Sequence, residues 1–337
     1  MKFAFLLSTF GGSPLQDGLD RGLRALGHDV VSFHNGRDRD YDVLVVFNQS
    51  AHNTSYAYPD FPKYEVPVAF VDCAEYGYFR RLPEVVKNYA NAFAPGSMTH
   101  DTKSRHEQNR LKNYLEGRSF PYFLREFSEK ISYPCGYYPI DYPLYYHSTC
   151  SDRPDRGDYL RRLDPIFLSW GASHPWRLKI TKDLRDASPG SEILVLEENG
   201  TPRMEQSTYF NRMVRARCSC SFDGYGSSSF RMTEVLVRTL LLMGPLSIRV
   251  REPLTDGVNC VAYSIQSQGE ECLSTNIASK LEEVLADPEL AFRIYEAGYD
   301  HCMTKLTEVA TAKYFVETVQ NHDWNLPTNL VAGDLYT

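Results

Sequence analysis

A glycine- and serine-rich segment in the second half of the chain has the residue types needed to hold a phosphorylated ligand. It runs from Asp223 to Glu234 (DGYGSSSFRMTE) and joins a short apolar strand pattern to an apolar helix pattern. Small residues let a ligand approach the backbone, and the first N–H groups of a helix lack intrahelical acceptors and favour anions. Arg231 would add a fixed positive charge, and Glu234, one turn later, could accept hydrogen bonds from ribose hydroxyls. The segment predicts a nucleoside-diphosphate site formed by Ser228, Ser229, Phe230, Arg231 and Glu234.

The same residues also fit a purely structural interpretation. Ser228 or Ser229 could cap the helix, and Arg231 could pair with Glu234 at the i, i+3 spacing that is common on helix surfaces. The segment alone does not decide between the two interpretations.

Two loops in the first half could also carry chemistry, because ligands bind beyond the carboxyl ends of strands in open parallel sheets. Residues 8–13 (STFGGS) follow the opening strand, and Gly11 and Gly12 are predicted to let the donor approach the backbone. The alternative is that these glycines only permit a tight turn. The second loop follows the strand at residues 67–71 and carries two carboxylates, Asp72 and Glu75.

A carboxylate held at a strand end and partly desolvated can act as a general base for an attacking hydroxyl. Asp72 is the first candidate and Glu75 the second. The alternative is a capping role or an ion pair with Arg80 or Arg81.

The elements that must position these loops alternate between strand and helix. Apolar runs at residues 3–7, 30–33, 43–47 and 67–71 predict buried parallel strands, and leucines at near-helical spacing between the first two predict a helix. Residues 133–147 contain three prolines and six tyrosines and predict an interdomain connection.

The alternation then restarts. Strands are predicted at residues 166–170, 192–196, 219–222, 246–250 and 260–263, and helices at 176–187, 204–217 and 230–242, after which the chain is expected to be helical to about residue 320. The sequence thus predicts an α/β fold of two Rossmann-like domains facing a cleft: an N-terminal, acceptor-side domain (1–150), a C-terminal domain that binds the nucleotide sugar (151–320) and a tail (321–337). The last helix could pack back on the N-terminal domain.

The run GSSSFRMTE at residues 226–234, followed by an apolar helix, Gly244, Pro245 and the segment PLTDGVN at 253–259, resembles the sugar-nucleotide-binding half of GT-B glycosyltransferases, especially their CgeB-like, "glycosyltransferase group 1" relatives. The resemblance covers roughly residues 165–320. It implies that Arg231 and Glu234 contact the diphosphate and ribose. It also implies that the loop from Gly171 to Arg177 belongs to the donor site and that Arg177 contacts phosphate.

Two features qualify what the resemblance implies about mechanism. Retaining members often carry two glutamates eight positions apart, but Gly226 stands eight positions before Glu234, which leans toward inversion and leaves the stereochemistry open. The formal DxD matches at residues 38–42 lie in a polar loop, so no metal site and no cofactor beyond the nucleotide sugar are expected.

Composition limits the other classes of function. The chain has 337 residues, a net charge of −7, and 42% hydrophobic and 23% charged residues, which is typical of a globular protein of about two domains. The negative charge does not favour nucleic-acid binding, and no apolar run approaches the ~20 residues of a membrane span. Eight cysteines without paired spacing favour a reducing cytoplasm.

The sequence therefore predicts a cytoplasmic, metal-independent GT-B glycosyltransferase that transfers a sugar from a nucleotide-diphosphate donor to a hydroxyl. A sugar-nucleotide epimerase or hydrolase, and a non-catalytic nucleotide-sugar-binding protein, are the alternatives on the same fold. The acceptor could be a glycan, a protein, a metabolite or a modified DNA base; neither it nor the oligomeric state can be read from the sequence.

Overall fold

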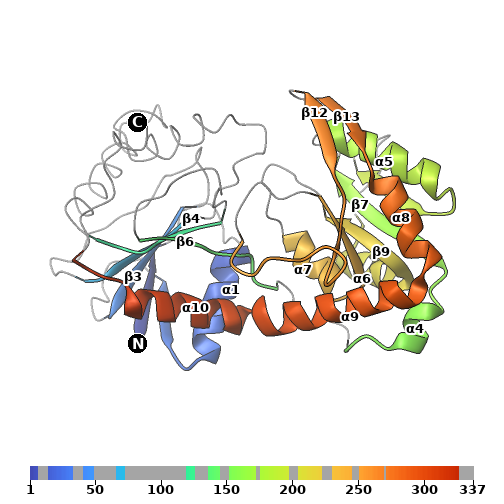
Figure 1. Cartoon of the computed structure of the whole chain (residues 1–337). Helices are drawn as coiled ribbons and strands as arrows, with labels where there is room; N and C mark the ends of the chain where they lie inside the picture. Colours follow the sequence, from blue (N-terminus) through green and yellow to red (C-terminus); the bar gives the residue numbers. More distant parts are fainter. Residues whose placement is uncertain are drawn as a thin grey trace. The chain divides into compact units, whose positions relative to one another are not determined.

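The computed structural model describes residues 1–6, 14–32, 41–48, 66–72, 119–125, 136–144, 152–171, 175–196, 204–221, 230–244, 250–268 and 271–325. The chain divides into two compact units (Figure 1). Unit 1 comprises Met1–Pro143, Ile248–Arg251 and Glu308–Thr337. Unit 2 comprises Leu144–Ser247 and Glu252–Thr307.

Unit 1 is built on a parallel sheet with the strand order β2-β1-β3-β4-β5-β6. The four predicted strands are present as β1 (Lys2–Leu6), β2 (Asp29–Ser32), β3 (Val43–Asn48) and β4 (Val68–Asp72). Two further strands, β5 (Tyr122–Leu124) and β6 (Tyr137–Pro139), were not expected.

The strand β6 lies within the tyrosine- and proline-rich segment that we predicted as a linker. Tyr137 pairs with Tyr122, and their rings stack with centroids 4.8 Å apart. Aromatic pairs across neighbouring strands stabilise a sheet, which explains why this segment joins it. The passage from unit 1 to unit 2 comes directly afterwards, between Pro143 and Leu144.

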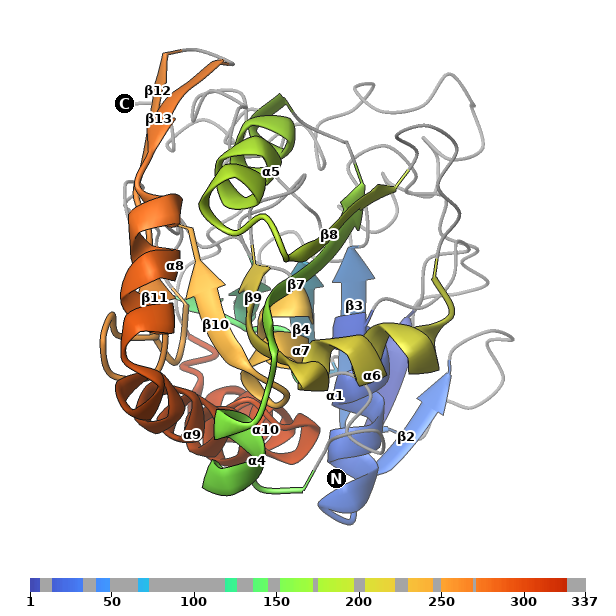
Figure 2. The same cartoon turned by 90° about the vertical axis from the view of Figure 1, so that its right-hand side faces the viewer.

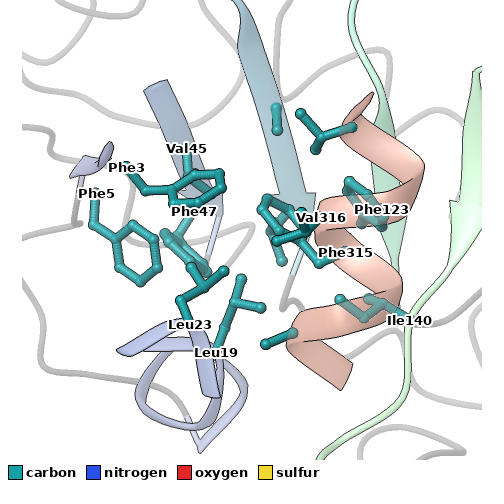
Figure 3. Close-up of a cluster of buried hydrophobic side chains, with 14 of the residues drawn as sticks. Phe3, Phe5, Leu19, Leu23, Val45, Phe47, Phe123, Ile140, Phe315 and Val316 are labelled. Atoms are coloured by element: carbon teal, nitrogen blue, oxygen red, sulfur yellow. The ribbon is translucent and has the colours of Figure 1, made fainter. Parts of the chain in front are cut away.

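The core of unit 1 lies between its sheet and the helices α1 (Pro14–Ala25) and α10 (Glu308–Asn321) (Figure 3). Leu19 and Leu23 of α1 are fully buried, as their helical spacing predicted, and Phe315 of α10 packs against Phe3 and Phe123. A Cβ at Gly22 would lie 2.2 Å from the Glu308 carbonyl oxygen, so the two helices approach to backbone contact there.

Unit 2 contains a five-stranded parallel sheet in the order β11-β10-β9-β7-β8. Its strands are β7 (Asp164–Gly171), β8 (Glu192–Leu196), β9 (Ala216–Ser221), β10 (Leu240–Met243) and β11 (Val261–Ala262). Its helices are α4 (Arg156–Leu160), α5 (Pro175–Ala187), α6 (Gln206–Arg215), α7 (Phe230–Leu236), α8 (Ile277–Ala286) and α9 (Pro288–Lys305).

Two details of unit 2 differ from the prediction. The helix expected at residues 230–242 ends at Leu236, and Leu240–Met243 form β10 instead. Four consecutive buried apolar residues fit a central strand as well as a helix, so the pattern could not separate them. The stretch expected to be helical after residue 263 begins with an antiparallel hairpin, β12 (Ile265–Gln268) and β13 (Glu271–Thr275).

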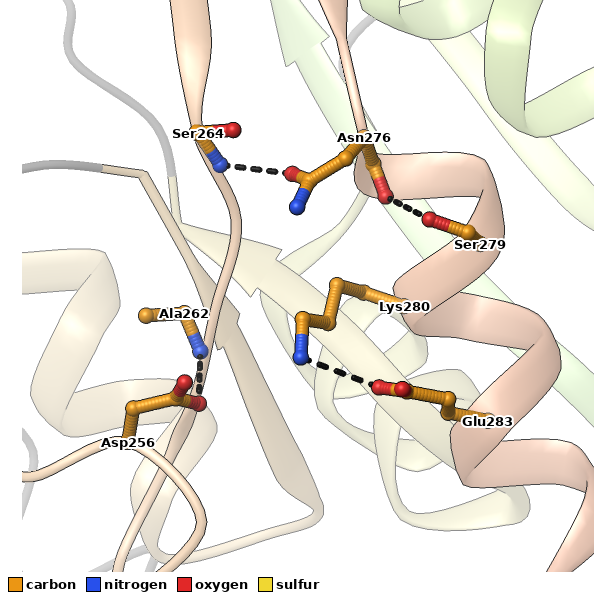
Figure 4. Close-up of polar contacts among 7 residues, drawn as sticks. All are labelled: Asp256, Ala262, Ser264, Asn276, Ser279, Lys280 and Glu283. Atoms are coloured by element: carbon orange, nitrogen blue, oxygen red, sulfur yellow. Dashed lines mark hydrogen bonds and ion pairs between the residues drawn. The ribbon is translucent and has the colours of Figure 1, made fainter.

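The hairpin runs from the start of α8 alongside α5 (Figure 2). At its base the Asn276 side-chain oxygen accepts a hydrogen bond of 2.6 Å from the Ser264 N–H (Figure 4). The Asn276 carbonyl oxygen accepts from the Ser279 hydroxyl at 2.9 Å. One residue therefore ties both strands of the hairpin to the first turn of α8.

Counted within each unit, the first five strands of both sheets have the same order, 2-1-3-4-5. The predicted fold class, two α/β units with parallel sheets, is confirmed. No helix in the described part of the chain is long and apolar enough to span a membrane.

Candidate functional site

The strand order of unit 2 places its switch point between β7 and β9. The chain leaves β7 through α5 toward β8 on one side, and it leaves β9 through α7 toward β10 on the other. In open parallel sheets, ligands bind in the crevice beyond the carboxyl ends of the two strands that flank such a point. The first turns of α5 and α7 are therefore the first place to look for a ligand site.

Each of these two helices carries an arginine in its first turn. Arg177 lies on α5, with its guanidinium carbon 5.7 Å from the centre of the Trp170 ring of β7. Arg231 lies on α7. Both cations act on the buried Cys220 thiol of β9, where they oppose the effect of burial, which raises the pKa of that thiol to about 12. Two positive charges thus converge on the carboxyl end of β9.

One nitrogen of Arg231 has no acceptor. Its Nη1 atom is buried, and no hydrogen bond to it is found among the residues that the structure describes. A buried charged donor without an acceptor is costly to the folded state unless a ligand or water satisfies it. An anion bound at this position would supply the acceptor that the atom lacks.

Glu234 lies one turn after Arg231 and is only 4% exposed. Burial raises the pKa of this carboxyl to about 7, and the positive charges of Arg231 and Arg238 act in the opposite direction. The structure contains no ion pair between Glu234 and Arg231, although both are described. The interpretation of these residues as a surface i, i+3 pair is therefore wrong, because the glutamate is buried.

The floor of the site is held by Tyr263, which follows β11. Its hydroxyl lies 3.4 Å from both the Cys220 thiol and the Ser221 carbonyl oxygen. Gly244, the residue after β10, leaves room for this ring, since a Cβ there would lie 3.2 Å from the same hydroxyl. The carboxyl ends of β9, β10 and β11 are thereby fixed together.

The structure brings some of the predicted site residues together. Gly171 ends β7, Phe230 begins α7, and Arg177, Arg231 and Glu234 all belong to unit 2 near the switch point. Asp72 ends β4 in unit 1, where it pairs with Asn48 and Leu124 at the carboxyl edge of that sheet. Gly11, Gly12, Glu75, Ser228 and Ser229 lie outside the described residues, so their predicted roles stay predictions.

Sequence reasoning did not find Trp170 and Tyr209, whose rings lie beside the two arginines, or Tyr263, which contacts Cys220 and Ser221. Tyr209 lies on α6 with its ring centre 5.8 Å from the guanidinium carbon of Arg231. Its helix reads as an ordinary amphipathic element, and nothing local distinguishes a ring that supports a cation from a ring that fills a core.

Among the described residues, no group of three or more His, Cys, Asp or Glu side chains is placed to hold a metal ion. Metal independence of the chemistry stays a prediction, since much of the first half of the chain is not described.

No protein-family model matches the sequence, and no curated protein matches it in sequence. Solved structures are similar over nearly the whole chain. One is the DNA-modifying enzyme β-glucosyltransferase, whose structure was determined with and without uridine diphosphoglucose. It superposes with a TM-score of 0.52 and 11% sequence identity, and the match covers 95% of this chain and 100% of that chain. A second is Anabaena HepE in complex with UDP and glucose: TM-score 0.50, 10% identity, 96% and 100% covered.

A third similar structure is T4 phage BGT in complex with UDP and Mn²⁺, with a TM-score of 0.47, 12% identity, and 95% and 99% of the two chains covered. At identities this low the likeness is one of fold. The two structures with TM-scores of 0.50 and 0.52 have the GT-B glycosyltransferase fold, and this chain shares it.

Proposed function

We propose that this protein is a glycosyltransferase that moves a sugar from a nucleoside-diphosphate donor to a hydroxyl acceptor. The observation that carries the proposal is the buried, acceptor-free Nη1 of Arg231 at the switch point of unit 2, where Arg177 also converges. A diphosphate supplies the oxygens that such a site lacks, and arginine matches phosphate geometry through its fixed fork of N–H donors.

In this proposal the two arginines stabilise the negative charge that develops on the leaving diphosphate. Fixed cations at a partly buried position need no reorganisation when that charge appears, which is why preorganised electrostatics is often the largest contribution to catalysis. Glu234, in its ionised form, accepts hydrogen bonds from the ribose hydroxyls. The general base is Asp72, with Glu75 second, and it removes the proton of the acceptor hydroxyl; Gly11 and Gly12 allow the donor to approach.

UDP is the first nucleotide to test, because the similar β-glucosyltransferase structure concerns uridine diphosphoglucose and HepE is in complex with UDP. We further propose that the chain is CgeB-like and that the protein's own cations replace a metal at the leaving group, with inversion at the anomeric carbon. T4 phage BGT is in complex with Mn²⁺, so each assay needs arms with Mn²⁺ and with EDTA.

The test measures binding of UDP, GDP, ADP, CDP and dTDP, and of their glucose conjugates, to wild type and to Arg231→Met by calorimetry and thermal shift. Ligands that bind only the folded state raise its apparent stability by mass action. Arg153→Met is the matched control, since it removes one positive charge from an exposed ion pair with Asp300 in the same unit.

One nucleotide class that binds wild type and Arg153→Met, but binds Arg231→Met roughly 10- to 100-fold more weakly, would support the donor site; that range corresponds to the ~1.5–3 kcal/mol of a hydrogen bond to a charged group. No binding to wild type would overturn it. Incubation with the bound donor then separates the chemical alternatives: sugar transfer to an added hydroxyl acceptor supports the transferase. Free sugar or an epimerised donor as the only product, or an unchanged donor, favours a hydrolase, an epimerase or a binding protein.

A further inference from the structure

The helix α6 presents two consecutive aromatic rings to two arginines of the α7 region. The Tyr209 ring centre lies 5.8 Å from the guanidinium carbon of Arg231, and the Phe210 ring centre lies 3.7 Å from that of Arg238. The rings of Tyr209 and Phe210 are themselves 5.4 Å apart. The two pairs are similar in chemistry but differ in their surroundings.

The pair formed by Phe210 and Arg238 is part of the core. Arg238 is 1% exposed, and its Nη1 donates a hydrogen bond of 2.9 Å to the Glu234 carbonyl oxygen. Phe210 is 7% exposed. This arginine uses its charge inside the protein, where it holds the end of α7.

The pair formed by Tyr209 and Arg231 belongs to the candidate site. Arg231 is the arginine with a buried, acceptor-free Nη1. The Tyr209 hydroxyl shares the environment of this cation: burial raises the pKa of the phenol, Arg231 and Arg238 lower it, and Glu234 raises it. The ring also packs on Phe167 of β7, with centroids 5.7 Å apart. Tyr209 thus contacts both the sheet and the cation.

A side chain with four torsions loses much rotamer freedom when it is fixed, at a cost of ~2 kcal/mol for arginine. A ring against the guanidinium removes part of that freedom before a ligand arrives and adds a cation–π attraction. It leaves the N–H groups of Arg231 able to reach an anion, since the ring is no hydrogen-bond acceptor for them. Preorganisation of this kind raises affinity without any new contact to the ligand.

We infer that Tyr209 is a positioning residue that holds Arg231 ready for the donor diphosphate. This inference rests on the proposed function, because it assigns a support to the arginine that binds the donor there. Tyr209 itself needs no contact with the nucleotide.

The experiment measures the Kd of UDP, or of the best binder among the five nucleoside diphosphates, by calorimetry on the full chain. Tyr209→Leu removes the ring, and Tyr209→Phe keeps it. Phe210→Leu is the matched control on the neighbouring pair. The same two Tyr209 variants are also made in an Arg231→Gln background, where the supported cation is gone.

We expect Tyr209→Leu to weaken binding about 2- to 30-fold, the range that corresponds to a cation–π contact, and Tyr209→Phe to restore affinity to within about 3-fold of wild type. Phe210→Leu should lower the melting temperature but leave the Kd unchanged. In the Arg231→Gln background, Tyr209→Leu should change the Kd by less than about 2-fold. A structural role would instead weaken binding equally in both backgrounds.

The inference is overturned, with the proposed function intact, if wild type binds a nucleoside diphosphate, Arg231→Met loses it, and Tyr209→Leu binds as wild type does. It is also overturned if Tyr209→Leu has the same effect with and without Arg231. If wild type binds none of the five nucleotides, the proposed function and the positioning role fail together.

Discussion

Two partly buried arginines, one in each unit, differ in the charges and acceptors that the protein places beside them. In unit 1, the Arg251 backbone N–H donates to Asp141 Oδ1 at 3.2 Å, and its Nη1 donates to the Ala310 carbonyl oxygen at 3.4 Å. Its buried Nε forms an ion pair with Asp141 Oδ2 at 3.8 Å, which is beyond hydrogen-bond distance. Its guanidinium carbon lies 5.0 Å from the Tyr314 ring centre. In unit 2, Arg231 has an aromatic ring beside it but a buried Nη1 without an acceptor among the described residues.

Under the proposed function, the difference separates a charge that serves the fold from a charge that serves a ligand. Arg251 ends the second of the three segments from which unit 1 is assembled and contacts the other two: Asp141 is near the end of the first, and Ala310 is near the start of the third. Removing one partner of a buried ion pair is costly, because it leaves the other charge buried without compensation.

The largest effect should come from Arg251→Met, which removes a cation from beside the Asp141 carboxylate, a group that is only 2% exposed. We expect the free energy of unfolding to fall by about 3–5 kcal/mol, as measured by urea denaturation. Adding Asp141→Leu should regain part of the loss. If Arg251→Met were as stable as wild type, the claim that Arg251 stabilises the fold of unit 1 would be wrong.

Glu234→Gln should stabilise the protein at high pH. Burial raises the pKa of this carboxyl from its ordinary value of 4.5 to about 7 in the folded chain, so the folded state holds the proton more tightly than the unfolded state does. Below pH 4.5 this group therefore does not affect the free energy of unfolding of the wild type. Between pH 4.5 and 7 that free energy falls, by at most about 3 kcal/mol in total, and above pH 7 it stays at the lower value.

The gain of Glu234→Gln over wild type should thus be absent at pH 4.5 and complete at pH 8, in urea titrations at several pH values. Glu317→Gln on the exposed face of α10 is the matched control and should leave the free energy of unfolding nearly unchanged. A destabilised Glu234→Gln at pH 8 would show that the carboxylate is needed by the fold rather than held for a ligand.

Arg231→Met should separate binding from stability. We expect UDP affinity to fall by roughly 10- to 100-fold, because a charge-assisted hydrogen bond to phosphate is lost. The free energy of unfolding should change by less than about 1 kcal/mol, since no acceptor among the described residues loses its partner. A loss of stability as large as that of Arg251→Met would remove the contrast between the two arginines.

A last effect, on stability alone, tests how tightly α1 and α10 are packed in unit 1. Gly22→Ala places a methyl group 2.2 Å from the Glu308 carbonyl oxygen, and the α1–α10 contact must open to accept it. We expect a loss of about 1–3 kcal/mol in urea denaturation. Gly190→Ala in unit 2 is the control. A Cβ added at this position would have no heavy atom within 4 Å, so the substitution should leave the free energy of unfolding nearly unchanged.

Much of the fold could be predicted because apolar runs and helical spacing are local signals. The strands β1, β3 and β4 and the buried face of α1 follow from residues such as Phe3, Val45 and Leu19. The strands β5 and β6 could not be predicted, because Tyr122 stacks on Phe70 and Tyr137, which lie on other strands distant in the sequence, rather than following a local pattern. The prediction of the boundary between α7 and β10 was wrong for a related reason. Leu240 and Leu241 are apolar residues that fit a buried helix and a buried strand equally well.

The sequence by itself determined the alternation of strands and helices, the residue types in each loop and the arginine and glutamate at the start of α7. Only the tertiary structure decided that β7 and β9 are neighbours, which brings Arg177 and Arg231 to one strand end. It also decided that Glu234 is buried rather than paired on a surface. The physical reason is that the burial pattern of a helix or strand follows from the order of apolar residues within that segment. Strand order and the partner of each charge depend instead on which distant segments come to lie side by side.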